Sequence, residues 1–296
     1  MALQTLDYDA ELLEQAGISQ NQLPEIFPSD QTFPLSAEGA AQLDLPCGIP
    51  IMLANPDGGM NQVGAGALLE GNMTLSVGTS GALRLSVSQP NTTQNHGLWC
   101  YRSPKGWLAG AATSGACNCI DWVRAQLFAP GTDYREMEGS AFVQDRPLFL
   151  PFLFGERAPG WDAERRGGFL LMRSSHTAQD CYQAVQEGIL FNLYQCYERL
   201  CADYGRPQCI RLSGGILHSQ RWTQMCADIF GRTMQAEQNT QSSLMGGAVL
   251  AMEKLGAIRE AALFTPPVRE IIVPDAGRHA EYLRQYKKYL EFYAVT

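Results

Sequence analysis

The segment "NPDGGMNQVGAGALLEGNMTLSVGTSGALRLS", residues 55–86, places one acid, Asp57, directly before a glycine-rich helix start. Its second half has apolar runs on either side of Gly78-Thr79-Ser80-Gly81, a pattern that predicts two strands joined by a tight turn. Glycine-rich corners at strand ends are places where the backbone approaches ligands closely. The first question is therefore what this acid and this turn do.

Asp57 follows the apolar run "IPIML", which predicts a buried strand over residues 51–54. Ligands collect at the carboxyl ends of strands in parallel α/β sheets. An acid there, with Gly58 and Gly59 leaving space beside it, suits a general base acting on a substrate hydroxyl. An Asp before a helix also serves as an N-cap for free N–H groups. Spacing alone favours the cap and leaves both roles open.

Gly78-Thr79-Ser80-Gly81 offers backbone N–H groups and two hydroxyls to an anion, although it is equally typical of a plain hairpin turn. Ala82 excludes a serine-hydrolase elbow, because it stands where Gly-x-Ser-x-Gly requires glycine. A similar corner, Ser213-Gly214-Gly215, precedes a helix starting near Ser219 and would let a base or ribose approach the main chain. By itself this second corner is a weak signal, since it matches neither the dinucleotide nor the P-loop pattern.

The rest of the chain alternates strands and helices, with a strong helix expected from Thr177 to Tyr204. Another helix, in "SSLMGGAVLAMEKLG", is expected to be capped by Ser242 or Ser243. This order predicts a mainly parallel sheet with helices on both faces. Residues 1–45 are predicted instead to form an extension with two short helices, one ended by Gly17 and one capped by Ser36.

Composition limits the partners. The chain of 296 residues is 45% hydrophobic, carries a formal charge of −8 and has no basic cluster, which disfavours nucleic acid and anionic membranes. A bound phosphate must then be held by backbone N–H groups, dipoles and a metal. Nine scattered cysteines indicate reduced thiols in the cytoplasm, and neither a signal peptide nor a membrane-spanning run is expected.

Other polar residues give weaker signals. Arg157, Arg165 and Arg166, in a long loop, either clamp an anion or pair with nearby acids, and pairing is the more common outcome. The histidines, at positions 96, 176, 218 and 279, show no ligand spacing, and Cys117-x-Cys119 is too short for a zinc pair. No residue is therefore assigned to a metal.

Taken in order, these motifs resemble the FGGY family of carbohydrate kinases over nearly the whole chain. "PDGGMNQVGAGAL" resembles the segment around the family's catalytic aspartate, and "SVGTSGALR" its phosphate-binding loop. "LPFLFGERAPGWDAERRGGF" is similar to its signature loop, although Leu171 stands where glycine is usual. "LSGGILHSQRWTQMCADIFGR" is similar to its adenosine-contacting turn and helix. The subtype resembles gluconate kinases, and then xylulose kinases.

The resemblance implies an actin-like (RNase H-like) ATPase domain, α/β, with a mixed sheet and helices on both faces. It implies ATP and Mg²⁺ as cofactors and a sugar or sugar acid as substrate. Asp57 becomes the catalytic base, with Gly58 and Asn61 on the substrate side. The remaining implied sites are the phosphate loop and the adenosine-binding residues: Gly78, Thr79, Ser80, Gly81, Ser213, Gly214, Gly215 and Ser219.

The resemblance covers only the second half of such a kinase. No "Asp-x-Gly-Thr" phosphate loop, expected in the first half, occurs in this sequence. We therefore expect residues 1–45 to be the tail of a missing first domain and residues 46–296 to be the nucleotide-binding domain. The chain would be the ATP-side half, inactive alone, with the missing domain as partner and homodimers possible through the face left open. The alternative is a non-catalytic nucleotide-binding or scaffolding remnant.

Overall fold

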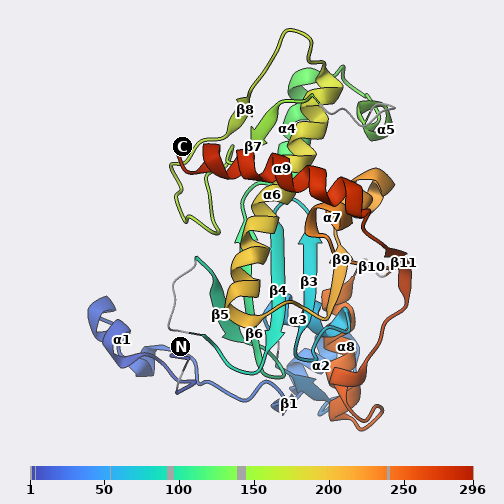
Figure 1. Ribbon diagram of the computed structural model, residues 1–296. Helices are drawn as coiled ribbons and strands as arrows, with labels where there is room; N and C mark the ends of the chain where they lie inside the picture. Colours follow the sequence, from blue (N-terminus) through green and yellow to red (C-terminus); the bar gives the residue numbers. More distant parts are fainter. Residues whose placement is uncertain are drawn as a thin grey trace.

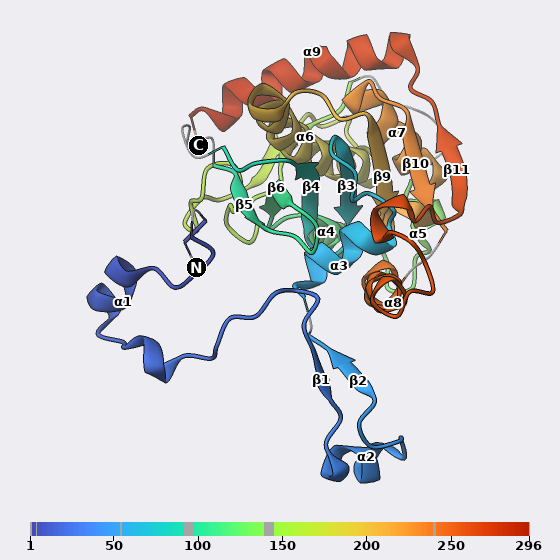
Figure 2. The ribbon, with the colours of Figure 1, turned by 90° about the horizontal axis from the view of Figure 1, so that it is seen from below.

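The computed structural model describes residues 2–3, 5–53, 55–91, 97–138, 145–238 and 241–295 (Figure 1). A seven-stranded sheet forms the centre of the molecule, and helices cover both of its faces. An N-terminal arm extends away from this body (Figure 2). No helix of the described segments has the length and apolar character that crossing a membrane requires.

The central sheet is mixed, with the spatial order β11-β10-β9-β3-β4-β6-β5. Its strands are β3 (Asn72–Val77), β4 (Gly81–Val87), β5 (Trp99–Arg102), β6 (Trp107–Thr113), β9 (Cys209–Ser213), β10 (Met234–Glu237) and β11 (Val268–Ile272). Only β3–β9 and β9–β10 pair in parallel. The prediction of a mainly parallel sheet is therefore wrong, because short turns join β3 to β4 and β5 to β6 and force antiparallel pairing.

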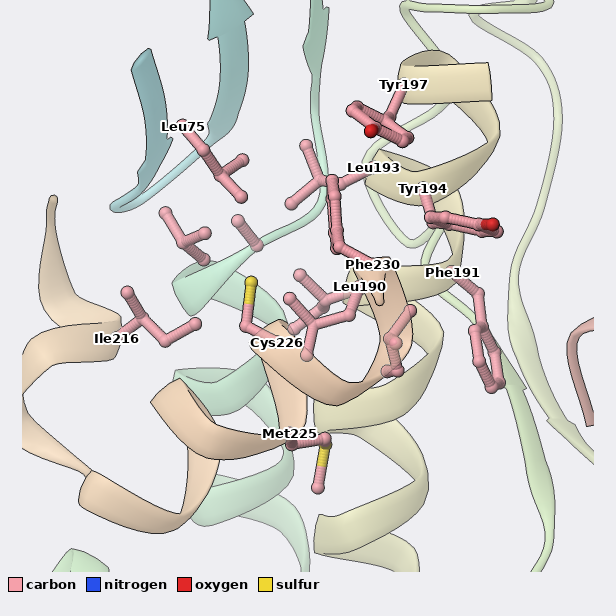
Figure 3. Close-up of a cluster of buried hydrophobic side chains, with 14 of the residues drawn as sticks. Leu75, Leu190, Phe191, Leu193, Tyr194, Tyr197, Ile216, Met225, Cys226 and Phe230 are labelled. Atoms are coloured by element: carbon pink, nitrogen blue, oxygen red, sulfur yellow. The ribbon is translucent and has the colours of Figure 1, made fainter. Parts of the chain in front are cut away.

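The larger apolar core lies on one face of the sheet. Helices α4 (Cys117–Leu127), α6 (Ala178–Tyr204) and α7 (Gln220–Phe230) pack there, with α9 (Ala276–Tyr293) outside them and the short α5 (Tyr134–Met137) nearby. Figure 3 shows Leu75 of β3 facing Leu190 and Leu193 of α6 and Cys226 of α7. The expected long helix is confirmed, with Thr177 as its N-cap. This core fixes the strand ends that carry the glycine corners.

Two helices cover the opposite face. These are α3 (Asp57–Gly64) and α8 (Ser242–Lys254), and they pack with unusually close backbones. A Cβ on Gly246 would lie 2.0 Å from the Met60 carbonyl oxygen, and one on Gly64 would lie 1.8 Å from that of Ser242. Gln241 is the N-cap of α8, so the prediction of a Ser242 or Ser243 cap is wrong by one residue. The glycines fix the position of α3, the helix that Asp57 begins.

The N-terminal arm contains α1 (Ala10–Ala16), α2 (Ala37–Leu43) and a separate hairpin of β1 (Thr32–Pro34) and β2 (Pro50–Met52). The helix ends predicted at Gly17 and Ser36 are confirmed. The prediction of a buried strand over residues 51–54 is wrong. Strand β2 pairs only with β1, its Ile51 is exposed, and Ala54 lies outside the described residues. Proline cannot donate to a central ladder, so Pro50 was a signal against this prediction.

The long loop after β7 (Leu148–Leu150) returns through β8 (Gly168–Leu170), and these two strands pair with each other. Leu171 follows β8 with φ of 59°, in the left-handed region that favours glycine. The half-exposed Leu171 therefore occupies a backbone position suited to the glycine that the resemblance led us to expect there.

Candidate active site

Asp57 is the first residue of α3, and its side chain is exposed at the molecular surface. Pro56 takes the N-cap position, so Asp57 is not the cap itself, although its Oδ1 accepts a hydrogen bond from the Gly58 N–H (2.7 Å). Ser243 of α8 donates to the Asp57 carbonyl oxygen (3.2 Å) and ties the helix start in place. Because β2 lies outside the central sheet, α3 and its contacts with α8, rather than a sheet strand, position this carboxylate.

The turn from Gly78 to Gly81 joins β3 and β4 and is fastened to the start of α4. The Gly78 carbonyl accepts from the Cys117 N–H (2.8 Å), and the Thr79 carbonyl accepts from the Asn118 N–H (3.3 Å). In a trans peptide the next N–H points opposite to the carbonyl. The N–H groups of Thr79 and Ser80 therefore point away from α4, and both residues are exposed. Successive amides with nearby hydroxyls are suited to hold an anion.

The Ser213-Gly214-Gly215 corner lies directly beside this turn. Ser213 is in register with Ser76 of β3, so both corners are at the same end of the sheet. A Cβ on Gly214 would lie 2.5 Å from the Val77 carbonyl oxygen, and its φ is 94°. Only glycine fits there, for both reasons. The structure thus brings together the two glycine corners that the sequence singled out.

Two cavities flank α3. The first, called here the Asp57 cavity, has a volume of about 600 Å³. Asp57, Ser80 and Gly81 line it together with arginine and aromatic side chains. Gly58 is buried behind two of the lining side chains, since a Cβ there would lie 2.4 Å from the Tyr101 Oη and 2.6 Å from the Arg84 Nε. The structure thus brings Asp57 and the end of the 78–81 turn to one cavity.

Burial raises the pKa of Tyr101. The nearby Arg84 opposes this rise, and the negative charge of Asp57 adds to it. A tyrosine so placed stays protonated at physiological pH, and its hydroxyl can donate a hydrogen bond into the cavity. Tyr101 stacks on Trp99, with ring centroids 4.8 Å apart. The sequence drew no attention to this aromatic pair, because β5 was not predicted as a strand and its partner Gly110 had no special spacing.

The second cavity, called here the Asn61 cavity, has a volume of about 370 Å³. Asn61, Ser213 and Gly214 line it, and polar atoms in its wall lack partners. These atoms are the Asn61 Oδ1, the Ser213 Oγ and the Glu237 Oε1. Burial raises the pKa of Glu237, while its hydrogen bond with Ser242 and the charge of Arg211 oppose that shift. Buried polar atoms left unpaired in a cavity wall are typical of a ligand site.

Asn61 differs from its expected place. The resemblance put it on the substrate side with Gly58, whereas it lines the other cavity. Four residues along a helix advance about 6 Å, so Asn61 lies one turn deeper than Asp57. Ser219 also differs, since it caps α7 by accepting from the Trp222 N–H (2.9 Å), bonds Glu138 and does not line this cavity. Gly215 approaches the Cys117 sulfur instead of the cavity.

The loop arginines divide as follows. Arg165 pairs with the buried Glu156 (2.9 Å) and Arg166 with the exposed Glu164 (3.0 Å), which confirms the structural role for these two. Arg157 is exposed and lines the Asp57 cavity.

All nine cysteines are free, and burial raises the pKa of Cys117 to about 11. Among the described residues, no group of three His, Cys, Asp or Glu side chains is placed to hold a metal.

The fold and these corners define an α/β domain of the actin-like ATPase class. A sequence profile of the FGGY family of carbohydrate kinases, C-terminal domain, matches residues 73–254, more than half of the chain. The chain therefore belongs to the FGGY family of carbohydrate kinases and contains its C-terminal domain, as the motifs predicted.

The relatives that match this chain are named as kinases of gluconate or of xylulose. Gluconokinase of Bacillus subtilis (strain 168) is 30% identical over 275 residues, which cover 87% of this chain and 53% of that protein. Structures of a xylulose kinase and a gluconate kinase from Lactobacillus acidophilus give TM-scores of 0.92 and 0.91, at 31% and 30% identity. Each of these two structural matches covers 99% of this chain and 61% of the chain in the solved structure. The chain thus spans little more than half the length of these relatives.

Proposed function

We propose that this chain is the ATP-side half of a kinase that phosphorylates a hydroxyl of a sugar or sugar acid. The observation that carries the proposal is that Asp57 and the end of the 78–81 turn line one open cavity. The relatives named gluconokinase and xylulose kinase support this reaction over a non-catalytic scaffold. Within residues 1–296, we propose 1–45 as the arm of another domain and 46–296 as the nucleotide-binding domain, with the β1–β2 hairpin spanning this boundary.

Each group has a role in this reaction. Asp57 accepts the proton of the substrate hydroxyl as that oxygen attacks the γ-phosphorus of ATP in line. The N–H groups of Thr79 and Ser80 and their hydroxyls hold phosphate oxygens, where negative charge is concentrated during transfer. Gly78 and Gly81 give this turn its shape, and Ser213, Gly214 and Asn61 border the nucleoside.

The residues present fit ATP and are compatible with Mg²⁺. The unpaired buried oxygens of Asn61, Ser213 and Glu237 in the wall of the Asn61 cavity offer hydrogen-bonding groups to a nucleoside. Magnesium takes one or two carboxylates and fills its remaining positions with phosphate oxygens and water. Of the described residues that line its cavity, Asp57 is the only acid, so we assign no further magnesium ligand on this chain.

The missing half is proposed as the main partner. Apolar side chains of the arm are exposed, including Phe27, Phe33 and Ile51, and we propose that an N-terminal kinase half covers them in the cytoplasm. Without that half, the open face gives homodimers a route to form. Light scattering of the chain at several concentrations, with and without the N-terminal half, tests both contacts.

A coupled assay of ADP release tests the activity. The 296-residue chain alone is expected to bind ATP and to release negligible ADP with gluconate or a pentulose. A polypeptide that also carries an N-terminal kinase half is expected to turn over. Absence of sugar-dependent ADP release by that longer polypeptide, over a panel of sugars and sugar acids, would contradict the proposal.

A further inference from the structure

The Asp57 cavity carries a charge opposite to that of the chain as a whole. The formal net charge of the protein is −8, yet Arg84, Arg102 and Arg157 line this cavity, and Asp57 is the one acid among its described lining residues. None of the three arginines forms a salt bridge with a carboxylate in the described part of the chain. Guanidinium groups gathered without acids create a site that attracts and orients anions.

Arg84 is the most constrained of the three. Leu83 and Leu85 point into the main core, so the alternation of β4 turns Arg84 toward α3. Its Nε is buried without a well-aligned acceptor, and a hydrogen bond with the Tyr101 hydroxyl holds the guanidinium while leaving its other N–H groups for a ligand. The absence of a side chain at Gly58 makes room for this group beside Tyr101. A buried guanidinium N–H without a well-aligned acceptor is costly, and an anionic ligand in the cavity would supply the acceptor.

The position of Arg84 separates it from the phosphate turn. It lies three residues beyond Gly81 on β4, about 10 Å along a strand that rises about 3.3 Å per residue. The transferred phosphate approaches at the Ser80–Gly81 end of the cavity. A linear sugar acid that offers a hydroxyl to Asp57 carries its carboxylate elsewhere on the carbon chain, and that carboxylate needs an anion-binding group of its own.

The neighbouring strands provide an apolar surface for the carbon chain. Gly110 of β6 is in register with Arg84, and a Cβ on Gly110 would lie 2.4 Å from the Trp99 Cη2. The missing side chain lets the Trp99 ring lie across β6 beside Arg84. The cavity thus combines a flat aromatic face, a general base at one point and guanidinium groups at another.

We infer that Arg84 is the specificity-determining residue of this cavity and that it binds the carboxylate of a sugar acid. This inference rests on the proposed function, since it assumes that the alcohol substrate occupies the Asp57 cavity. A neutral ketose offers no carboxylate to the Arg84 guanidinium, and a site built around such a group discriminates strongly against ligands that lack its partner. Arg102 and Arg157 add attraction for the same charge from the rim.

The direct test follows the Arg84 Nε–Hε signal in the ¹⁵N-labelled 296-residue chain by NMR, with the signal assigned from its loss in Arg84→Lys. D-gluconate is expected to shift this signal, whereas D-xylulose at equal concentration leaves it in place. The Arg166 signal, from an exposed ion pair outside the cavity, serves as control. No shift with gluconate, an equal shift with xylulose, or a shift with MgADP in place of gluconate overturns the inference.

Kinetics of the polypeptide that includes an N-terminal kinase half separate this inference from the proposed function. Arg84→Met is expected to raise the KM for gluconate about 10- to 100-fold, the value of one charged hydrogen-bonded pair, and Arg84→Lys to recover part of it. An equal rise for xylulose refutes the inference while the proposed function stands. Gluconate binding through Arg84 without any turnover refutes the proposed function while the inference stands. Thermal unfolding monitored by circular dichroism confirms that the variants fold.

Discussion

The two cavities on either side of α3 differ in charge and in how their walls are built. The Asp57 cavity is open, with arginines, stacked aromatic rings and one exposed carboxylate. The Asn61 cavity is narrower, bordered by glycine backbone and by buried polar atoms without partners. The same eight-residue helix contributes Asp57 to one and Asn61 to the other. We propose that α3 separates an alcohol-binding side from a nucleotide-binding side, so that each side can be perturbed on its own.

The largest effect is expected from Asp57→Asn. In the polypeptide that includes an N-terminal kinase half, turnover should fall by roughly 10²- to 10⁴-fold because the general base is lost. The dissociation constant for ATP, measured by calorimetry, should change little because the Asn61 cavity is intact. Activity within a factor of two of wild type would remove Asp57 from its role, and a large loss of ATP affinity would end the separation of the two sides.

Gly214→Ala tests the nucleotide side. The added Cβ meets the Val77 backbone and enforces an unfavourable φ, so we expect a loss of about 2–5 kcal/mol in unfolding free energy together with weaker ATP binding. Gly205→Ala is the matched control, because Gly205 has φ of 79° but no atom within 4 Å of its Cβ position. Denaturant unfolding of both variants measures the difference, and equal losses would contradict the close approach of β9 to the 78–81 turn.

The joint between α3 and α8 offers a matched pair within one helix. Gly246→Ala places a Cβ 2.0 Å from the Met60 carbonyl oxygen and should cost about 1–3 kcal/mol of unfolding free energy. Gly247→Ala meets nothing nearer than 3.9 Å and should stabilise α8 by about 0.5–1 kcal/mol. Only the first should also lower turnover, because it moves α3 and with it Asp57. Similar stability changes in the two variants would refute this packing.

The smallest effect is expected at Leu171, outside both cavities. Leu171→Gly should stabilise the protein by about 0.5–1 kcal/mol because it relieves a left-handed backbone position. Met172→Gly is the control, since Met172 is about equally exposed but is not one of the residues with a positive φ. It should destabilise by a similar amount. Thermal unfolding compares them, and a loss of stability in Leu171→Gly would be the contrary result.

The corners of the site could be predicted from the sequence because each is local. The hairpin turn at 78–81 and the strand end before Gly214 depend on residues next to one another in the chain. Their convergence followed from the order of the motifs and the family resemblance. The close approach of Gly214 to Val77 explains why the glycine pattern had to be there.

The rest depended on tertiary contacts that spacing does not encode. The run around Ile51 is apolar enough for a core strand, yet it pairs only with β1 on the exposed arm. Asn61 lies one helical turn beyond Asp57 and lines the other cavity, whereas the resemblance placed it on the substrate side. Arg84 was overlooked because its importance depends on Gly58, Tyr101 and Gly110, which lie on three other elements.

The most direct test of the separation at α3 is a crystal structure of the 296-residue chain with MgADP. We expect the nucleoside in the Asn61 cavity beside Gly214 and the terminal phosphate at the N–H groups of Thr79 and Ser80, with the Asp57 cavity open. Density for the nucleoside in the Asp57 cavity, against Arg84 and Trp99, would contradict the account.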